Sequence, residues 1–320
     1  MNRTLDHMIE RAQTICVLGH INPDGDCVGS TLALYNYIHR TDAGKKVTVY
    51  LEEPSSKFAF LPGFEKIVSG NEVKKSYDLC IVADCADTAR IGRFVNYLEA
   101  AKESFLIDHH FTNKGFCDAR VIDPESSSTC ELLYGLLKKD RIDADIARCL
   151  YTGIIHDTGV FKHSCTSPKT MRVAAKCMKF GFDFGKIIDD SFYSMNIAQK
   201  KLMGVMFQDL KLACEGKFVY GKLNIRTMKE YGVTSGKDTD GFIDNIRTTD
   251  GTVAAGFFYE LPDGTYRGSL RSSTDQVNVA EIAQTFGGGG HKRAAGFFLG
   301  KDIEKEIDKV IGMVEEQLKK

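Results

Sequence analysis

Short apolar runs alternate with longer amphipathic stretches along the first 180 or so residues. Four runs are predicted to form buried strands, over 14–19, 45–53, 77–85 and 103–110. The amphipathic stretches carry apolar residues at helical spacing, and they predict helices over 27–40, 93–102, 129–139, 143–157 and 167–181. Strands that alternate with helices form parallel sheets with crossover connections. The pattern therefore predicts an α/β domain with a doubly wound, mostly parallel sheet.

The pattern changes after about residue 190. A helical stretch over 193–212 is expected to connect two domains, and strand-like segments follow it. Two of these, TVAAGFFYE and TYRGSLRSS, flank LPDG, a sequence typical of hairpin turns. The remaining predicted elements are a helix over 278–286, a strand in RAAGFFLG and a helix over 302–319. We therefore predict three parts: an α/β catalytic domain over 1–190, a linker helix within 191–213 and a smaller α+β substrate-binding domain over 214–320.

Composition and charge narrow the class of protein. The chain is 43% apolar and 27% charged, and its formal net charge is −1. That charge argues against binding long duplex nucleic acid, which requires a basic surface. The ten cysteines show no CxxC pair, so reduced thiols in the cytosol are expected. The N-terminal stretch is an amphipathic helical pattern rather than a signal peptide, and no apolar run could span a membrane. We expect a cytoplasmic protein without a membrane partner.

Acidic residues and histidines follow several of the apolar segments. They are His20, Asp24 and Asp26 after the first strand, Asp84 in the third, Asp108, His109 and His110 in the fourth, and Asp157 at the end of the helix over 143–157. One aspartate after a strand is usually a turn or helix-capping residue. Here, four separate segments each end in acidic residues or histidines. This pattern indicates one shared site, because ligands bind at the carboxyl edge of open α/β sheets.

This set of side chains has the composition of a metal site. Imidazole and carboxylate ligands without thiolates suit Mn²⁺, with Mg²⁺, Co²⁺ and Fe²⁺ as alternatives. Five carboxylates and three histidines exceed the needs of one ion, so two ions that share a bridging carboxylate are expected. Two ions about 3.5–4 Å apart can lower the pKa of a shared water and neutralise a phosphoryl group.

A glycine run in the second half is the other candidate site. TFGGGGHKRAAG places four glycines before His291, Lys292 and Arg293. Successive backbone N–H groups there could form a nest for phosphate or for the end of a nucleotide. A flexible hairpin is the alternative. The segment is not a Walker A loop, because no Gly-Lys-Ser/Thr follows at the required spacing.

The four acidic motifs together resemble the signature of the DHH phosphoesterase superfamily, in the expected order along residues 1–185. The resemblance implies that His20, Asp24 and Asp84 hold one metal ion. It implies that Asp26, Asp84, His109 and Asp157 hold the other, with Asp84 as the bridge. His110 would face the substrate phosphate, and Asp108 would orient the histidines. Cys27 departs from the family's usual small residue, and we expect an inert buried thiol there.

The glycine run and the upstream GSLRSS resemble the DHHA1 domain that accompanies one branch of this superfamily. The resemblance implies substrate contacts from Arg271, Gly288, Gly289, Gly290, His291 and Arg293. Arg247 is a weaker candidate. The two-domain layout resembles the nano-RNase group of bifunctional oligoribonucleases. Membership would imply hydrolysis of short single-stranded RNA to mononucleotides, removal of the 3′-phosphate of adenosine 3′,5′-bisphosphate (pAp), and a possible homodimer.

Three alternatives stay open. A phosphodiesterase of cyclic or linear dinucleotides, such as cyclic di-AMP or pApA, would share both domains. An inorganic pyrophosphatase would share the metal motifs but carry a different, basic C-terminal domain, and the glycine run argues against it. A non-catalytic nucleotide-binding protein is expected to have lost metal ligands, whereas every acid and histidine of the signature is present.

Overall fold

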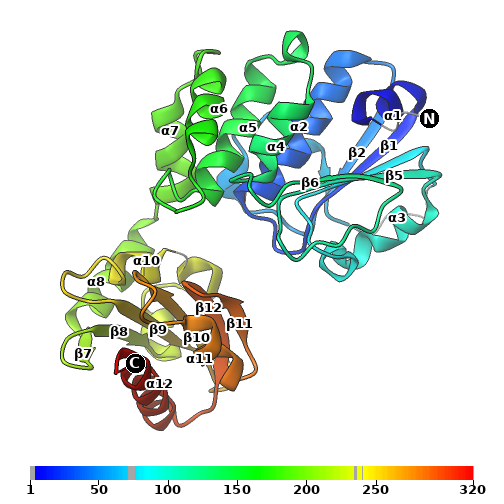
Figure 1. The fold of residues 1–320 in the computed structure, drawn as a ribbon. Helices are drawn as coiled ribbons and strands as arrows, with labels where there is room; N and C mark the ends of the chain where they lie inside the picture. Colours follow the sequence, from blue (N-terminus) through cyan, green and yellow to red (C-terminus); the bar gives the residue numbers. More distant parts are fainter. Residues whose placement is uncertain (1–3, 71–75, 234–235, 240, 320) are drawn as a thin grey trace. The chain divides into compact units, whose positions relative to one another are not determined.

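The chain divides between Ser194 and Met195 into two compact units. The computed structural model describes residues 4–70, 76–233, 236–239 and 241–319. Each unit is built around its own six-stranded sheet, and Figure 1 labels most of their strands. Among the described residues, no helix combines the length and the apolar composition needed to cross a membrane.

The first sheet is entirely parallel, as the alternation of strands and helices predicted. Its strands, in spatial order, are β3 (Ile67–Val68), β2 (Lys46–Tyr50), β1 (Thr14–Leu18), β4 (Leu79–Ala83), β5 (Glu103–Asp108) and β6 (Ala119–Ile122). The edge strands β3 and β6 were not predicted. Both are short and only partly buried, so neither has the apolar run that marks the central strands.

Helices cover both faces of this sheet, which is the doubly wound arrangement (Figure 1). Ile15 and Val17 of β1 point into a core shared with one set of helices. That set comprises α1 (Leu5–Arg11), α2 (Gly25–Thr41), α4 (Thr129–Leu136), α5 (Ala144–Asp157), α6 (Pro168–Met178) and α7 (Phe184–Ile188). Cys16 and Leu18 point into the opposite core, beneath α3 (Val95–Ala100) and the 3₁₀ turns that precede it.

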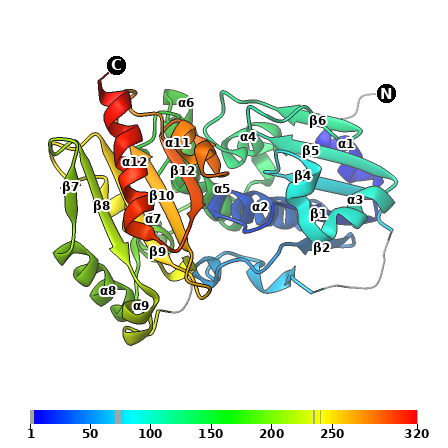
Figure 2. The same ribbon diagram turned by 90° about the horizontal axis from the view of Figure 1, so that it is seen from below.

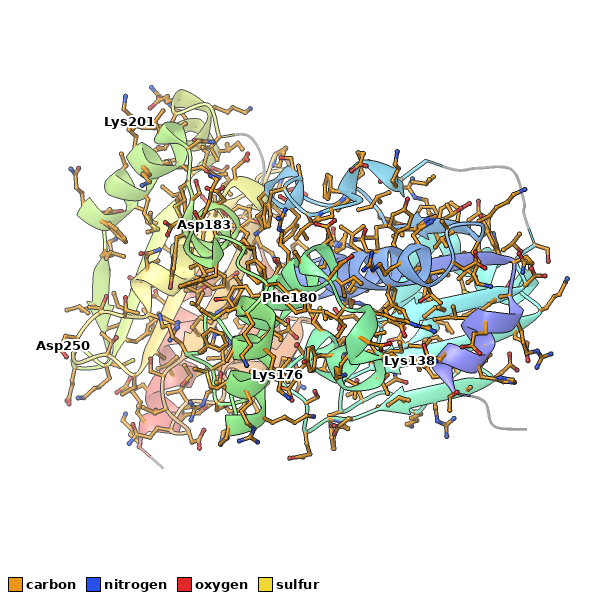
Figure 3. All side chains as sticks on the ribbon, turned by 90° about the horizontal axis from the view of Figure 1, so that it is seen from above. Lys138, Lys176, Phe180, Asp183, Lys201 and Asp250 are labelled. Carbon is orange, nitrogen blue, oxygen red and sulfur yellow. The ribbon has the colours of Figure 1, made fainter. Side chains whose placement is uncertain are left out.

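The helix α6 illustrates how burial follows the helical period. Val173, Ala174 and Cys177 are buried against the core that α6 shares with β1, whereas Lys176, labelled in Figure 3, is exposed. One apolar stripe and one charged face make it a surface helix. Such helices leave the interior of the unit to α2 and α5, which pack against each other.

Glycine allows α2 and α5 to approach closely. A Cβ atom at Gly29 of α2 would lie 2.6 Å from the carbonyl oxygen of Cys149 in α5. A Cβ atom at Gly153 of α5 would lie 2.5 Å from Oδ1 of Asp26. The carbonyl oxygen of Cys149 belongs to the backbone of α5, so it can move away only if the helix itself shifts. These two helices supply Asp26 and Asp157, and their close packing fixes the distance between those side chains.

Gly29→Ala is expected to destabilise the first unit by about 2 kcal/mol, because overpacking forces backbone shifts. Urea unfolding would measure the loss. Gly135→Ala is the matched control, since a Cβ there meets nothing within 4 Å on helix α4. That variant should be neutral or stabilised by up to about 1 kcal/mol. Equal stability of the two variants would contradict the packing account.

The second sheet is mixed. Its strands, in spatial order, are β11 (Gly289–His291), β12 (Ala294–Leu299), β10 (Tyr266–Ser272), β9 (Ala254–Glu260), β8 (Phe218–Leu223) and β7 (Lys211–Ala213). All neighbours are antiparallel except β8 and β9. One face packs on α11 (Val279–Thr285) and α12 (Ile303–Leu318), and Figure 2 shows α12 across the strands. The other face packs on α8 (Ile197–Gln208), α9 (Ile225–Glu230) and α10 (Phe242–Ile246).

The stretch expected to form one connecting helix is divided. A π-helical turn covers Asp189–Tyr193, and α8 begins only after Asn196, which forms a capping box with Gln199. The last residues of the expected helix, Lys211–Ala213, form β7 instead. Leu202 and Met206 of α8 are buried in the core of the second unit. This helix is therefore part of that unit rather than a free linker.

Candidate metal centre

The carboxyl ends of β1 and β4 meet at the centre of the first sheet. The strand order reverses direction between β1 and β4, because β2 and β3 lie on one side of this pair and β5 and β6 lie on the other. Open α/β sheets bind ligands at such a switch point. His20 follows β1 and Asp84 follows β4, and the distance from His20 Nε2 to Asp84 Oδ2 is 3.5 Å. His20 and Asp84 therefore lie together at the carboxyl edge of the sheet, where the sequence predicts a shared site.

Asp84 lies between two groups of side chains. Its Oδ2 faces His20, and its Oδ1 lies 3.7 Å from His109 Nε2. The side chain is almost completely buried, and Thr129 Oγ1 donates a hydrogen bond to Oδ1 over 3.0 Å. Its backbone has a φ of 57°, a left-handed conformation that is uncommon outside glycine and is often found at functional sites. That conformation ends the strand and turns the carboxylate into the centre of the cluster.

The first group contains His20 and Asp24. Asp24 caps helix α2, because its Oδ1 accepts hydrogen bonds from the backbone N–H groups of Asp26 and Cys27. The same oxygen lies 3.7 Å from His20 Nε2. His20 Nδ1 lies 2.8 Å from the carbonyl oxygen of Ile21 and donates to it. Because this bond occupies Nδ1–H, Nε2 is the ring nitrogen that faces Asp24 and Asp84, and it can bind a cation once it loses its proton.

The second group contains Asp26, His109 and Asp157. His109 Nε2 lies 3.0 Å from Asp157 Oδ2. Its Nδ1 lies 3.3 Å from the carbonyl oxygen of Ser126, which again leaves Nε2 toward the carboxylates. Asp26 is fully buried and accepts hydrogen bonds from the first two backbone N–H groups of helix α4, at 2.6 and 2.9 Å. The ligand atoms of Asp26, His109 and Asp157 lie close enough together to hold one cation, and so do those of Asp84, His109 and His110; on the other side of Asp84, the corresponding set is His20, Cys27 and Asp84.

His110 is oriented by a separate network. Its Nδ1 lies 2.7 Å from Asp108 Oδ1, so Nε2 points away from that carboxylate. Asn113 donates to Asp108 Oδ2 over 2.6 Å and to the carbonyl oxygen of Cys85 over 3.0 Å. Asp108 is thus fixed on both oxygens. It contacts His110 directly, whereas the partner of His109 is the Ser126 carbonyl rather than Asp108.

The electrostatics of the cluster favour a cation. Burial, and then the charges of Asp84 and Asp157, raise the pKa of Asp26 well above its usual range. Burial, with Asp24 and Asp84, raises the pKa of Asp157 to about 7. Burial opposes protonation of His109, but the carboxylates, above all Asp157, outweigh it and raise its pKa to about 10. Without a metal, the cluster must take up protons to relieve this repulsion. Divalent ions with these ligands would relieve it instead, so the residues fit a metal site.

Metal binding is expected to strengthen as the pH rises. Burial lowers the pKa of His20, but Asp24 and Asp84 outweigh burial and raise it to about 10. His20, like His109, therefore holds a proton near neutral pH, and Asp157 holds one part of the time. A metal ion must displace those protons, so Mn²⁺ affinity should rise at least about tenfold between about pH 6 and pH 7.

Titration calorimetry in two buffers of different ionisation enthalpy would measure this affinity and count the released protons. Asp157→Asn is the matched control, because it removes the carboxyl group whose pKa is about 7 and should release fewer protons near that pH. An affinity that is independent of pH would show that the ligands are already deprotonated and would contradict the prediction.

Cys27 lies beside the first group. Its Sγ accepts a hydrogen bond from the backbone N–H of His20 over 3.3 Å, and the residue is fully buried. Burial first, and then the charge of Asp84, raise the pKa of the Cys27 thiol well above its usual range. A thiol that stays protonated is a poor nucleophile and metal ligand. This environment agrees with the inert thiol expected from the sequence.

The basic candidates of the second unit have carboxylate partners. Arg271 Nε lies 3.5 Å from Asp244 Oδ1, and Arg247 Nε lies 3.2 Å from the same oxygen. Lys292 and Arg293 both contact Asp275, at 3.6 and 3.1 Å. Arg247, the weaker candidate from the sequence, therefore lies beside Arg271.

The glycine run forms a hairpin strand. Gly289, Gly290 and His291 make up β11, which pairs with β12. A Cβ atom at Gly288 would lie 2.3 Å from the carbonyl oxygen of Gly296, and Gly290 has a φ of 149°. These two glycines are thus required by the hairpin itself. Gly289 and His291 are exposed, and a Cβ at Gly289 would meet nothing within 4 Å.

The sequence did not identify several residues that hold the cluster in place. Ser126, Thr129 and Asn113 act through a backbone carbonyl, a hydroxyl and an amide. Their only sequence signal is a concentration of small polar residues in SSST and in the turn after His110. That signal is common to surface loops, so it could not single them out.

Comparisons with known proteins identify the family of each half of the chain. Residues 14–154 match the DHH family, N-terminal domain, and residues 216–320 match the DHHA1 domain. The "probable bifunctional oligoribonuclease and PAP phosphatase NrnA" of Streptococcus mutans is 31% identical, with 92% of each chain covered. The "bifunctional oligoribonuclease and PAP phosphatase NrnA" of Thermus thermophilus is 29% identical over 95% of this chain and 90% of that protein.

The fold also matches a solved structure. The crystal structure of an exopolyphosphatase-related protein from Bacteroides fragilis superposes with a TM-score of 0.88 at 24% identity, covering 98% of this chain and 96% of that one. This likeness concerns the fold, whereas the sequence matches concern descent. The chain therefore belongs to the DHH family of phosphoesterases and carries a DHHA1 domain in its C-terminal half.

Proposed function

We propose that this protein is a two-metal hydrolase that degrades short oligoribonucleotides to mononucleotides and also removes the 3′-phosphate of pAp. The observation that carries the proposal is the position of Asp84, whose two carboxylate oxygens face His20 and His109 on opposite sides. One carboxylate between two sets of ligands suits a pair of ions. The names of the relatives from Streptococcus mutans and Thermus thermophilus support the substrate class.

Each ion has its own set of ligands in this proposal. His20, Asp24 and Asp84 would hold one, and Asp26, Asp84, His109 and Asp157 would hold the other. Mn²⁺ suits this mixture of imidazole and carboxylate better than Zn²⁺ does, with Mg²⁺, Co²⁺ and Fe²⁺ as competitors. When bound, such a pair supplies an activated water and neutralises the phosphoryl charge.

The remaining polar side chains bind the substrate. His110, held by Asp108, donates from Nε2 to a phosphoryl oxygen, and the protonated imidazole offsets the charge that develops there. In the second unit, Arg271 and His291 bind the nucleotide end. The site is completed by Gly288, Gly289, Gly290 and Arg293. The substrate would approach the backbone most closely at the exposed Gly289. The possible homodimer and the cytoplasmic location stay predictions.

Hydrolysis by the purified protein with Mn²⁺, with and without chelator, tests the proposal. The substrates are a five-nucleotide RNA, pAp, pApA, cyclic di-AMP and pyrophosphate, side by side. We expect metal-dependent cleavage of the RNA and of pAp, with cyclic di-AMP and pyrophosphate little changed. Cleavage of dinucleotides alone would instead favour a dinucleotide phosphodiesterase with the same metal site. Binding of nucleotides without turnover of any substrate would favour a non-catalytic protein.

A further inference from the structure

One face of the second sheet is only partly covered. Residues of β10 alternate in burial, so Tyr266 and Leu270 point into the core beneath α11 and α12. Arg267, Ser269 and Arg271 point to the opposite face and are only half-buried. Because strand neighbours share faces in register, these three residues lie beside Phe298, Gly296 and Ala294 of β12.

Helices cover the β8–β9 part of that opposite face and leave the β12 and β11 part exposed. Phe257 of β9 is buried against Phe242 of α10. Across the sheet, by contrast, Phe298 is 58% exposed, and Gly289 to His291 are exposed as well. A single exposed phenylalanine needs no explanation. The surroundings of Phe298 are what distinguish it.

Arg267 lies against this phenylalanine. The two residues are direct cross-strand partners, and the guanidinium carbon lies 4.5 Å from the centre of the Phe298 ring. A Cβ atom at Gly296 would lie 2.9 Å from Arg267 Nη2, so the guanidinium extends over this glycine. Gly296 pairs in register with Gly289 of the glycine run. The positive charge of Arg267 is therefore directed toward the strand that carries the candidate nucleotide site.

Arg267 differs from its basic neighbours in its partners. Arg271 contacts Asp244, and Lys292 and Arg293 contact Asp275. Among the residues that the structure describes, no carboxylate lies within ion-pair distance of Arg267. Its guanidinium keeps its N–H donors available for an anion. A cation without an acidic partner, stacked on an exposed ring beside a glycine strand, is a suitable site for a phosphate and a base.

We propose that Arg267 and Phe298 form a subsite for a further nucleotide of the RNA chain. Arg267 would contact a phosphate of that nucleotide, and its base would stack on the exposed part of the Phe298 ring. The backbone positions of Arg267 and Arg271 are about 13 Å apart along β10. The subsite is therefore separate from the nucleotide end at Arg271 and His291. This inference rests on the proposed function. It adds that the enzyme binds longer RNA substrates more tightly than shorter ones.

The consequence is a preference that depends on substrate length. A substrate as short as pAp, with one base, ends at the Arg271 and His291 site and does not reach Phe298. A longer RNA places a second base over the ring. Aromatic stacking is tolerant of base identity, because every base has a π face. The subsite would thus favour longer chains without favouring a sequence.

Kinetics of single variants over a series of substrates test this subsite. We expect Phe298→Ala and Arg267→Ala each to lower kcat/KM for a five-nucleotide RNA by about tenfold. Both variants should stay within about twofold of the parent protein on pAp. Phe298→Trp, which keeps an aromatic face, should retain activity on the RNA. Leu212→Ala is the control, because Leu212 is an exposed apolar residue on β7, at the opposite edge of the same sheet.

RNAs that lack one base identify the stacked nucleotide. We would prepare five-nucleotide RNAs that each lack the base at one position. At one of these positions, the missing base should lower kcat/KM for the parent protein as much as Phe298→Ala does on intact RNA. With that RNA, Phe298→Ala should lower kcat/KM no further. Equal losses on pAp and on RNA, or no loss on RNA, would overturn the subsite. If the parent protein cleaves no RNA, the proposed function is wrong, but the subsite can still be tested by binding. Fluorescence anisotropy of the labelled RNA then decides: binding that both variants weaken supports the subsite, and absent or unchanged binding overturns it.

Discussion

Asp84→Asn is expected to lower kcat/KM for short RNA by at least about 10³-fold, because a catalytic metal ion contributes several kcal/mol to transition-state stabilisation. Both oxygens of Asp84 face ligand groups, at 3.5 Å from His20 and 3.7 Å from His109. An amide has one oxygen and no charge, so it cannot serve both groups equally. Initial rates with saturating Mn²⁺ measure the loss, and direct metal titration should show that fewer ions bind.

The fold should survive this substitution. Asparagine tolerates left-handed backbone conformations better than most residues, and Asp84 has a φ of 57°. The amide oxygen can still accept the hydrogen bond from Thr129. The variant also removes one negative charge from a crowded cluster. We therefore expect the metal-free variant to unfold at a temperature no lower than the metal-free parent. Asp84→Ala should unfold earlier, because alanine lacks the acceptor and is less suited to that conformation.

Asp78→Asn provides the matched control at the opposite end of β4. Asp78 accepts hydrogen bonds from Lys102, Thr14 and the backbone of Gln13. Lys102 first, and then Thr14, hold the pKa of this carboxyl below its usual range. Its replacement should cost about 1 kcal/mol or more of stability and leave kcat unchanged. If Asp84→Asn kept its activity, or if both variants lost activity equally, the bridging role of Asp84 would be wrong.

The sequence predicted the central part of the fold because its signals are local. Buried strands such as β1 and β4 are uninterrupted apolar runs, and the acids that follow them mark one sheet edge. Edge strands lack this signal. β7 and β11 are three residues long and mostly exposed, so their pairing is set by neighbours distant in sequence rather than by their own composition. β11 was read only as a glycine run.

The site was predictable in its ligands but not in its supports. His20, Asp84 and His109 carry a recognisable spacing, whereas the atoms that orient two of them are the carbonyl oxygens of Ile21 and Ser126. Every residue has a carbonyl, so no sequence pattern marks these two. The cross-strand pair of Arg267 and Phe298 was missed for a related reason. Their contact depends on the register of β10 and β12, which the sequence alone does not fix.

His110→Ala is expected to lower kcat by about 10²- to 10³-fold, the usual effect of removing one donor to a developing negative charge. Metal binding should change little, because His110 is not one of the proposed ligands and its Nδ1 is held by Asp108, although that nitrogen also lies 3.8 Å from Asp84 Oδ1. His7→Ala removes an exposed histidine from α1 and serves as the control, with no expected effect on kcat. A His110→Ala variant with full activity would exclude His110 from phosphate binding.

Asp108→Asn tests how His110 is kept protonated. The hydrogen bond that His110 donates to Asp108 raises the pKa of His110 above its usual value. The protonated, donating imidazole therefore persists to higher pH in the parent protein than it would without that carboxylate. Replacement by asparagine removes the charge and places an amide opposite Asn113, so the pKa of His110 should fall. We expect kcat to drop by about tenfold and the alkaline limb of its pH profile to move to lower pH. A purely structural role for Asp108 would lower activity at every pH and leave the position of that limb unchanged.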